Sequence, residues 1–151
     1  MSSEAPVDLE GPVLSDISII SDNDNMSWGQ EGDNITLSFT SNETIQTPDL
    51  TNISIVGLTD LVFTSLNDNN TRWQVTGTVD EEAVSGAGGS GGSGYADFSI
   101  SVTDQAGNTG SSVADTTEGE RVALDVEAPV VNAVSIRSSN DNSSLAKAGD
   151  N

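Results

Sequence analysis

The chain has 151 residues, with 24 acidic side chains against four basic ones and a formal net charge of −20. This balance excludes nucleic acid and anionic membrane as partners, because phosphate binding needs clustered Lys and Arg, and it favours cations. The absence of His and Cys excludes Ser-His-Asp and Cys-His catalysis, thiolate zinc sites and disulfides. Carboxylate-pair glycosidase chemistry stays possible without these residues, but it needs a cleft for which a small domain offers little room, so we expect no enzyme. The lack of any apolar run of about 20 residues predicts no membrane insertion.

Short segments of alternating apolar and polar residues predict β-strands along most of the chain. In chain order they centre on residues 17–19, 35–39, 53–55, 73–79, 98–102 and 122–124. Turn sequences such as NDN, GDN, AGN and EGE separate them, and no segment keeps a helical apolar period. The pattern predicts an all-β antiparallel β-sandwich of seven or eight strands.

One segment interrupts this pattern. Residues 85–94 read SGAGGSGGSG, a composition typical of flexible linkers, whether engineered or natural. We expect a flexible loop there that carries no chemistry.

The chain contains an internal repeat. Residues 12–34 align with residues 129–151 without a gap, at an offset of 117, and 12 of the 23 positions are identical. This period is close to the size of one β-sandwich module, about 100 residues. We therefore expect a start or linker over 1–10, one complete repeat over 11–127, and the beginning of the next repeat over 128–151.

Three motifs carry a resemblance to a known family. They are the GDN-plus-strand unit (32–40), TDQAGN (103–108) and DVEAPVV (125–131). In this order and spacing they resemble the bacterial Ig-like, cadherin-like tandem repeats of giant surface adhesins, over nearly the whole chain except 83–95. The Gly/Ser segment departs from that pattern, because it makes the loop there longer than the resemblance implies.

The resemblance implies an Ig-like fold, a secreted or cell-surface location, and neighbouring repeats as partners. Its implied function is that of a non-catalytic extender, or spacer, which holds an adhesive tip away from the cell. It also implies calcium at the junctions between repeats. A general rival explanation of the charge is that an acidic surface suits a salty habitat without binding any specific ion.

The turn sequence SDNDN (21–25) is the first candidate calcium site. Asp22, Asp24 and Asn25 offer carboxylate and amide oxygens, and calcium takes 6–8 oxygen ligands. The alternative is ordinary turn chemistry, because Asn and Asp bond their own backbone and tolerate left-handed geometry. The Gly and Glu that an EF-hand loop requires are missing.

The linker DVEAP (125–129) is the second candidate. Asp125 and Glu127 point the same way from an extended segment, and Pro129 stiffens it. A cation shared by the linker, a loop and the next repeat would fix the angle between repeats. The alternative is a solvated acidic linker.

Two further candidates are weaker. Asp104 and Asn108 could bind calcium at one end of the sandwich, but stabilisation of a hairpin turn at Gly107 is the favoured interpretation. Glu81 lies in the acidic run 80–82, which could complete a cation site or simply be a solvated charge run.

The path of the chain decides which candidates meet, and two arrangements are open. In the first, the linker leaves the sandwich beside the SDNDN turn and the 80–95 loop, and the acidic side chains of these three segments gather there. In the second, the EGE turn (118–120) reverses the chain, so that the linker leaves beside Asp104.

Two other interpretations remain open. A carbohydrate-binding sandwich would need exposed coplanar aromatic side chains, whereas Trp73 is expected in the core and Trp28 is expected to cover apolar surface in a loop. Residues 129–151 are expected to be disordered, or to pair with an exposed sheet edge of the same or another chain.

Overall fold

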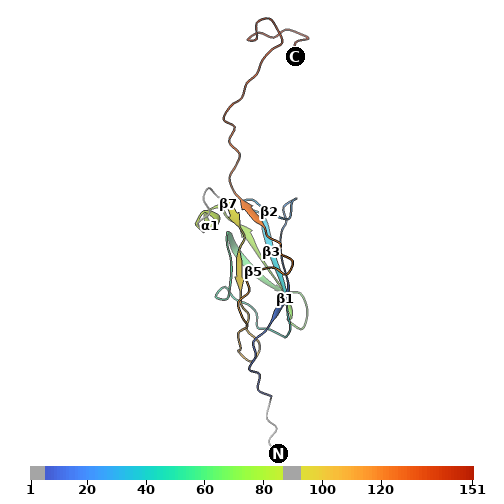
Figure 1. Cartoon of the computed structure of the whole chain (residues 1–151), viewed down its shortest axis with the longest axis vertical. Coiled ribbons are helices and arrows are strands. Elements are labelled where there is room, and N and C mark those ends of the chain that lie inside the picture. Colours follow the sequence, from blue (N-terminus) through green and yellow to red (C-terminus); the bar gives the residue numbers. More distant parts are fainter. Residues whose placement is uncertain (1–5, 87–92) are drawn as a thin grey trace, which may run out of the picture.

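The computed structural model describes residues 6–86 and 93–151 and confirms the all-β prediction (Figure 1). One layer is a four-stranded antiparallel sheet in the order β1-β3-β6-β5. Its strands are β1 (Leu14–Ser21), β3 (Asn34–Ser41), β6 (Arg72–Val79) and β5 (Leu58–Ser65).

The facing layer is assembled from shorter strands. It holds β2 (Trp28–Gly29), β4 (Ile53–Ile55), β7 (Ser93–Tyr95), β8 (Phe98–Ile100) and β9 (Ala123–Asp125). Strand β9 lies between β2 and β7 and is parallel to β2, whereas β4 pairs with β8. Because β7 and β8 follow one another along the same segment, the two small sheets form one interrupted layer.

The core lies between the two layers. Along β3, Ile35, Leu37 and Phe39 are almost fully buried, while the intervening Thr36 faces outward and shares a hydrogen bond with Thr76 of β6. The facing layer contributes further buried side chains, namely Ile53, Ile55, Phe98, Ile100, Val122 and Leu124. Burial of each large apolar side chain contributes about 1.5–3 kcal/mol, so this core supplies the main stabilisation.

The structure departs from the predicted elements in three places. The described residues form nine strands, whereas seven or eight were expected. Strands β2, β5 and β7 were not predicted from the sequence. Helix α1 (Glu81–Gly86) replaces the expected charge run at its start; the carboxylate of Asp80 caps it by accepting the Ala83 N–H at 2.9 Å. Of the predicted Gly/Ser loop, residues 87–92 lie outside the described residues, while Ser93–Tyr95 form β7.

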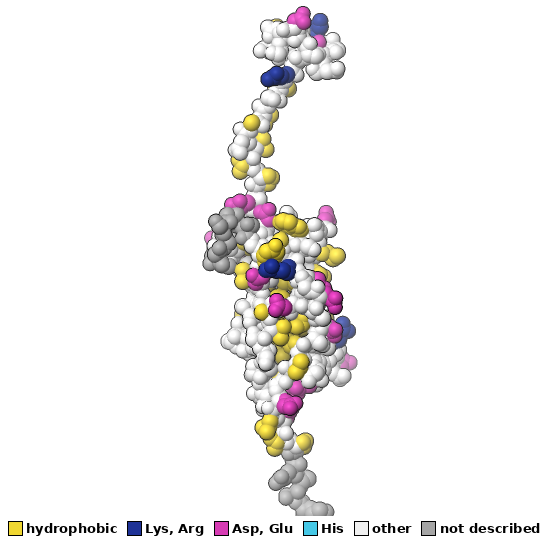
Figure 2. All heavy atoms as spheres, viewed as in Figure 1, with side chains coloured by type: hydrophobic (Ala, Val, Ile, Leu, Met, Phe, Trp, Pro, Cys, Tyr) yellow, Lys and Arg dark blue, Asp and Glu magenta, His cyan; other side chains and the backbone are white. Residues whose placement is uncertain are grey.

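The chain enters and leaves the sandwich at opposite ends (Figure 1). We call these the N-terminal pole (residues 8–13, 42–46 and 104–110) and the C-terminal pole (residues 22–34, 80–86 and 125–127). Beyond the C-terminal pole, residues 128–151 extend away from the sandwich and form no strand (Figures 1 and 2). In the described part of the chain, no helix is long and apolar enough to cross a membrane.

Candidate metal centre

The hairpin turn 104–109 is organised by one buried carboxylate at the N-terminal pole. Asp104 is 1% exposed. Its Oδ1 accepts the N–H groups of Gly107 at 2.7 Å and Asn108 at 2.8 Å, and its Oδ2 accepts the Asn108 side-chain amide at 2.8 Å. Gly107 takes a φ of 99°, which this turn requires. Turn stabilisation is therefore one role of Asp104 in this fold.

Two more carboxylates lie beside Asp104. Oxygens of Asp8, Glu43 and Asp104 all lie within 4.8 Å of one another. Two calcium ligands on opposite sides of the ion are separated by about twice the Ca–O distance, or roughly 5 Å. The spacing and the all-oxygen chemistry of this cluster, which we call the acidic triad, therefore fit a calcium ion.

The acidic triad is electrostatically strained. Burial raises the pKa of the Glu43 carboxyl, and repulsion from Asp8 and Asp104 raises it further. Burial alone would raise the pKa of Asp104 as well, but the hydrogen bonds from Asn108 and Gly107 outweigh it and lower that pKa below its ordinary value. A divalent cation between the three carboxylates would relieve the repulsion on Glu43.

The segment that brings Asp8 to the triad is held mainly by the hairpin turn around residues 104–110. We call residues 8–13 the incoming segment. The Asn108 side-chain amide donates to the Asp8 carbonyl at 3.0 Å, and the Val13 N–H donates to the Asn42 side chain at 2.8 Å. At Gly110 an added Cβ would collide with the Pro12 carbonyl, so the close approach requires glycine there. The incoming segment is thus docked on the N-terminal pole of the sandwich.

Asp8 and Glu43 were missed as candidates from the sequence, but one signal could have found Asp8. The repeat alignment extends four residues toward the N-terminus, where DLEGP (8–12) matches DVEAP (125–129). Asp8 is therefore the counterpart of Asp125, and Glu10 that of Glu127. Glu43 carries no such signal, because only the folded chain brings it beside a turn 61 residues further along.

Most polar side chains of the SDNDN turn form hydrogen bonds within residues 21–34. The Asp22 carboxylate accepts the Asn34 N–H at 2.8 Å and the Asn34 side-chain amide at 3.0 Å, and these bonds lower the pKa of Asp22. The Asn23 amide donates to Asp33 at 2.7 Å, and its oxygen accepts the Asn25 N–H at 3.0 Å. This is the turn chemistry of Asx residues.

The second copy of this turn forms the same bonds without a sandwich around it. The Asn140 side chain donates to Asp150 and accepts the Asn142 N–H, as Asn23 does with its counterparts. The Lys147 N–H donates to Asp150 at 2.8 Å, matching the bond from Gln30 to Asp33. The sequence 21–34 therefore encodes a self-contained turn, in which Asp33 and its counterpart Asp150 accept equivalent hydrogen bonds.

The outgoing linker lies beside the SDNDN turn at the C-terminal pole, as in the first arrangement. Asn25, Asp125 and Glu127 line one groove of about 280 Å³ there, together with Trp28. Glu81 lies at the same pole, where its N–H donates to the Glu31 carboxylate at 2.6 Å. Asp104 and Asn108 lie at the opposite pole.

This pole does not assemble a compact carboxylate cluster. Within residues 6–86 and 93–151, the acidic triad is the one group of three carboxylates whose oxygens approach within 4.8 Å of one another. The predicted ligands Asp22, Asp24, Glu81, Asp125 and Glu127 therefore share a pole without converging on a point. The stronger calcium candidate is at the N-terminal pole, where the sequence indicated only Asp104 and Asn108.

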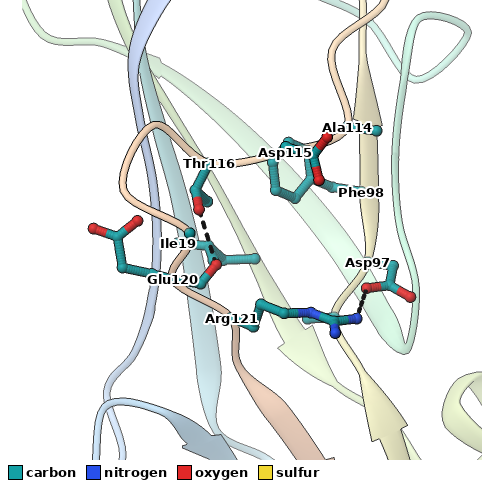
Figure 3. A pocket seen from close by; sticks show the side chains of 10 residues that line it. Ile19, Asp97, Phe98, Ala114, Asp115, Thr116, Glu120 and Arg121 are labelled. Carbon is teal, nitrogen blue, oxygen red and sulfur yellow. Dashed lines mark hydrogen bonds and ion pairs between the residues drawn. The ribbon is translucent and has the colours of Figure 1, made fainter.

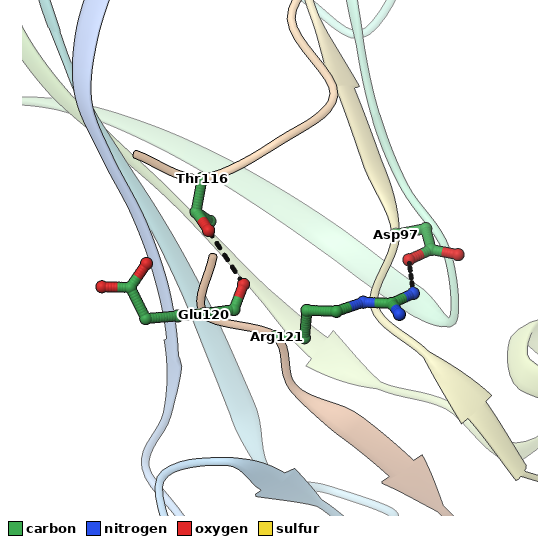
Figure 4. A network of polar contacts seen from close by, with 4 residues as sticks. All are labelled: Asp97, Thr116, Glu120 and Arg121. Atoms are coloured by element: carbon green, nitrogen blue, oxygen red, sulfur yellow. Dashed lines mark hydrogen bonds and ion pairs between the residues drawn. The ribbon is translucent and has the colours of Figure 1, made fainter. Parts of the chain in front are cut away.

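A second cavity, of about 300 Å³, opens between β1 and β8 (Figure 3). Ile19 and Phe98 contribute apolar atoms, and Asp115 and Glu120 contribute carboxylates. Arg121 crosses its side and donates to Asp97 at 2.8 Å, while Thr116 donates to the Glu120 carbonyl at 3.0 Å (Figure 4). The ion pair is exposed and contributes little to stability.

Comparison with protein-family models, with curated proteins and with solved structures gives no match for this chain.

Proposed function

We propose that this chain is a non-catalytic extender module of a repetitive bacterial cell-surface adhesin, stiffened by calcium at the junction between repeats. The observation that carries the proposal is that the two copies of one linker sequence lie at opposite poles of the sandwich. DLEGP (8–12) is docked on the N-terminal pole, and its copy DVEAP (125–129) leaves from the C-terminal pole. Successive copies joined in this way extend end to end, as a spacer requires.

The position of calcium follows from the same repeat. Asp8 reaches the acidic triad from the incoming segment, while Glu43 and Asp104 belong to the sandwich. A cation shared by the three would tie the segment to the module that follows it. Because Asp125 is the counterpart of Asp8, we propose that it plays this part for the next repeat. Extracellular modules bind calcium at about 10⁻⁴–10⁻³ M, so millimolar calcium outside the cell would occupy the site.

The partners and location in this proposal are neighbouring repeats of the same protein and the outer surface of a bacterium. The charge supports an ion requirement, since 22 acidic residues against two basic ones within residues 1–128 oppose compaction by self-repulsion.

Thermal unfolding tests the calcium part of the proposal. We expect the melting temperature to rise with millimolar CaCl₂ and to fall again with EGTA. Asp8→Asn and Glu43→Gln should remove this response, because neither side chain is needed for the hairpin turn. Asp60→Asn, on β5 and outside the triad, is the matched control and should keep the response. Identical curves in CaCl₂ and EGTA would refute calcium binding.

A control with NaCl distinguishes specific calcium binding from general screening of the acidic surface. NaCl at the same ionic strength as CaCl₂ should stabilise the wild type less, and it should act equally on Asp8→Asn. If NaCl stabilises as well as CaCl₂, the acidic surface suits high salt and the site binds no specific ion.

A further inference from the structure

The outer face of the β2-β9-β7 sheet carries two exposed aromatic side chains in one row. Trp28 is 48% exposed and Tyr95 is 46% exposed. Both pair in register with Ala123, Trp28 from β2 and Tyr95 from β7. Residues directly opposite one another on neighbouring strands point to the same face, so the small Ala123 side chain lies between the two rings.

The spacing of the rings follows from the sheet. Neighbouring strands lie about 4.8 Å apart, so rings on β2 and β7 are separated by roughly 10 Å. The neighbours that point inward, Leu124 and Ala96, are buried in the core, which fixes the orientation of the row. The result is an outer face, which we call the platform, with an aromatic side chain at each end of one row.

Polar groups border the platform on both sides. Toward the C-terminal pole, the groove beside Trp28 is lined by Gln30, Asp125 and Glu127. On the other side, the Arg121 guanidinium lies over the Tyr95 ring, 3.8 Å from its centroid, and is held by Asp97. Arg121 therefore covers one face of Tyr95, which leaves Trp28 as the ring on which a ligand can stack. A groove of about 280 Å³ beside an exposed aromatic side chain, with a few placed polar groups, has the kind of lining found in small-ligand sites. It fits a sugar ring, whose C–H face stacks on an aromatic side chain while its hydroxyls take hydrogen bonds.

The charge around the platform restricts the ligand. Its borders contribute the carboxylates of Asp97, Asp125 and Glu127, and Arg121 is already paired with Asp97. Anionic saccharides would be repelled by this surface. A neutral saccharide keeps the stacking and the hydrogen bonds without that cost.

The indole of Trp28 is not required by the turn in which it lies. Its counterpart in the second copy is Leu145. The Leu145 N–H donates to the Asn142 carbonyl at 2.9 Å, as the Trp28 N–H donates to the Asn25 carbonyl at 2.9 Å. The same turn therefore forms with leucine, and the ring at position 28 is available for another role.

We propose that the face formed by Trp28, Ala123 and Tyr95 binds a neutral oligosaccharide that crosses the three strands. Trp28 stacks on one ring of the sugar chain, and the Arg121–Asp97 pair beside Tyr95 bonds the hydroxyls of a ring further along. This activity is independent of the extender role. The second copy within this sequence lacks this ring, because it has Leu145 in place of Trp28.

The test is a titration of the 151-residue chain followed by amide and indole NMR signals. The probes are neutral tetrasaccharides of glucose, mannose, xylose and N-acetylglucosamine, with a heparin tetrasaccharide as the anionic comparison. We expect at least one neutral probe to shift the Trp28 indole N–H and the Ala123 amide, and heparin to shift neither. If no neutral probe shifts these signals at millimolar concentration, the proposal is overturned.

Variants then assign the effect to the platform. Trp28→Leu, which copies the second turn and should keep the wild-type melting temperature, is expected to weaken binding about tenfold. Adding Leu145→Trp to that variant should not restore binding, because the second turn has no β9 or Tyr95 beside it. Val62→Thr on the opposite sheet is the control for non-specific contact. Unchanged affinity in Trp28→Leu, or binding restored by Leu145→Trp, would contradict the platform.

Discussion

The side-chain amide of Asn108 donates a hydrogen bond to the main-chain carbonyl of Asp8, across 100 residues of sequence and 3.0 Å of space. This bond joins the incoming segment to the hairpin turn 104–109 of the sandwich. It also places the Asp8 carboxylate beside Glu43 and Asp104. The incoming segment is therefore docked by protein contacts alone, and in the proposed extender this contact would prepare the junction with a preceding repeat before any ion binds.

Asn108→Ala tests this contact. The substitution removes the bond to Asp8 and a bond to the Asp104 side chain, and we expect it to lower the free energy of unfolding by about 1–2 kcal/mol. Amide hydrogen exchange should become faster over residues 8–13 and stay unchanged in β3. Asn69→Ala, at an exposed position in the β5–β6 turn, should change neither. Unaltered exchange over 8–13 would show that the bond does not hold the incoming segment.

Within the acidic triad, two carboxyls with pKa values shifted in opposite directions should contribute to the pH dependence of stability. The pKa of Glu43 is raised above its ordinary value of 4.5 in the folded state, so its contribution to stability is present below 4.5 and is lost as the pH rises through the raised pKa. The pKa of Asp104 is lowered below 3.8, so its contribution is present above 3.8 and is lost as the pH falls through the lowered pKa.

Without calcium, stability should therefore rise as the pH falls from 7 toward the raised pKa of Glu43, and should decline below 3.8. Urea unfolding at a series of pH values in EGTA measures this. Glu43→Gln should reduce the rise and leave the acid decline in place. A wild-type stability that does not rise as the pH falls toward 4.5 would be inconsistent with the raised pKa of Glu43.

The two copies of the turn provide a matched pair of variants. Asn23→Ala removes the bonds to Asp33 and to the Asn25 N–H, and should destabilise the sandwich by about 1–2 kcal/mol. Asn140→Ala removes the equivalent bonds from the second turn, which packs on no sheet, and should leave the main melting transition unchanged. Equal losses from the two variants would mean that the second turn contacts the sandwich.

The exposed strand-like segment 129–137 predicts association between chains. It copies β1, yet Val134 is 85% exposed and Ile136 is 95% exposed, whereas their counterparts Ile17 and Ile19 are buried. Unpaired apolar segments of this kind pair with open sheet edges. We expect concentration-dependent association by sedimentation, strengthened by salt that screens the −20 charge. Ile136→Asn should abolish it and Val7→Asn should not; a wild type that stays monomeric at high salt would contradict the prediction.

The sequence was sufficient for the strands with regular alternation and failed where alternation is absent. Ile35, Leu37 and Phe39 identify β3 because one side of that strand is buried and the other is polar. Strand β5 was missed because Leu61, Val62 and Phe63 are consecutive apolar residues at the edge of the sheet. Helix α1 was missed because six residues are too few to show a helical period.

Only part of the candidate site could be predicted from the sequence, because the rest depends on contacts between distant segments. Asp104 and Asn108 belong to one local turn and could be found from TDQAGN. Asp8 and Glu43 join them only through the packing of the incoming segment and the end of β3 on that turn. The carboxylates of the C-terminal pole were predicted to gather from their shared position, but Asp22 is committed to Asn34 and does not converge with the others.

The account depends most directly on where calcium binds. The decisive measurement is a CaCl₂ titration of the calcium-free 151-residue chain, monitored by NMR signals from every residue that can be assigned. The account predicts saturable changes, at millimolar calcium or below, centred on Asp8, Glu43 and Asp104, and their loss in Asp8→Asn. Changes centred instead on Asn25, Asp125 and Glu127, or no saturable change at either pole, would contradict it.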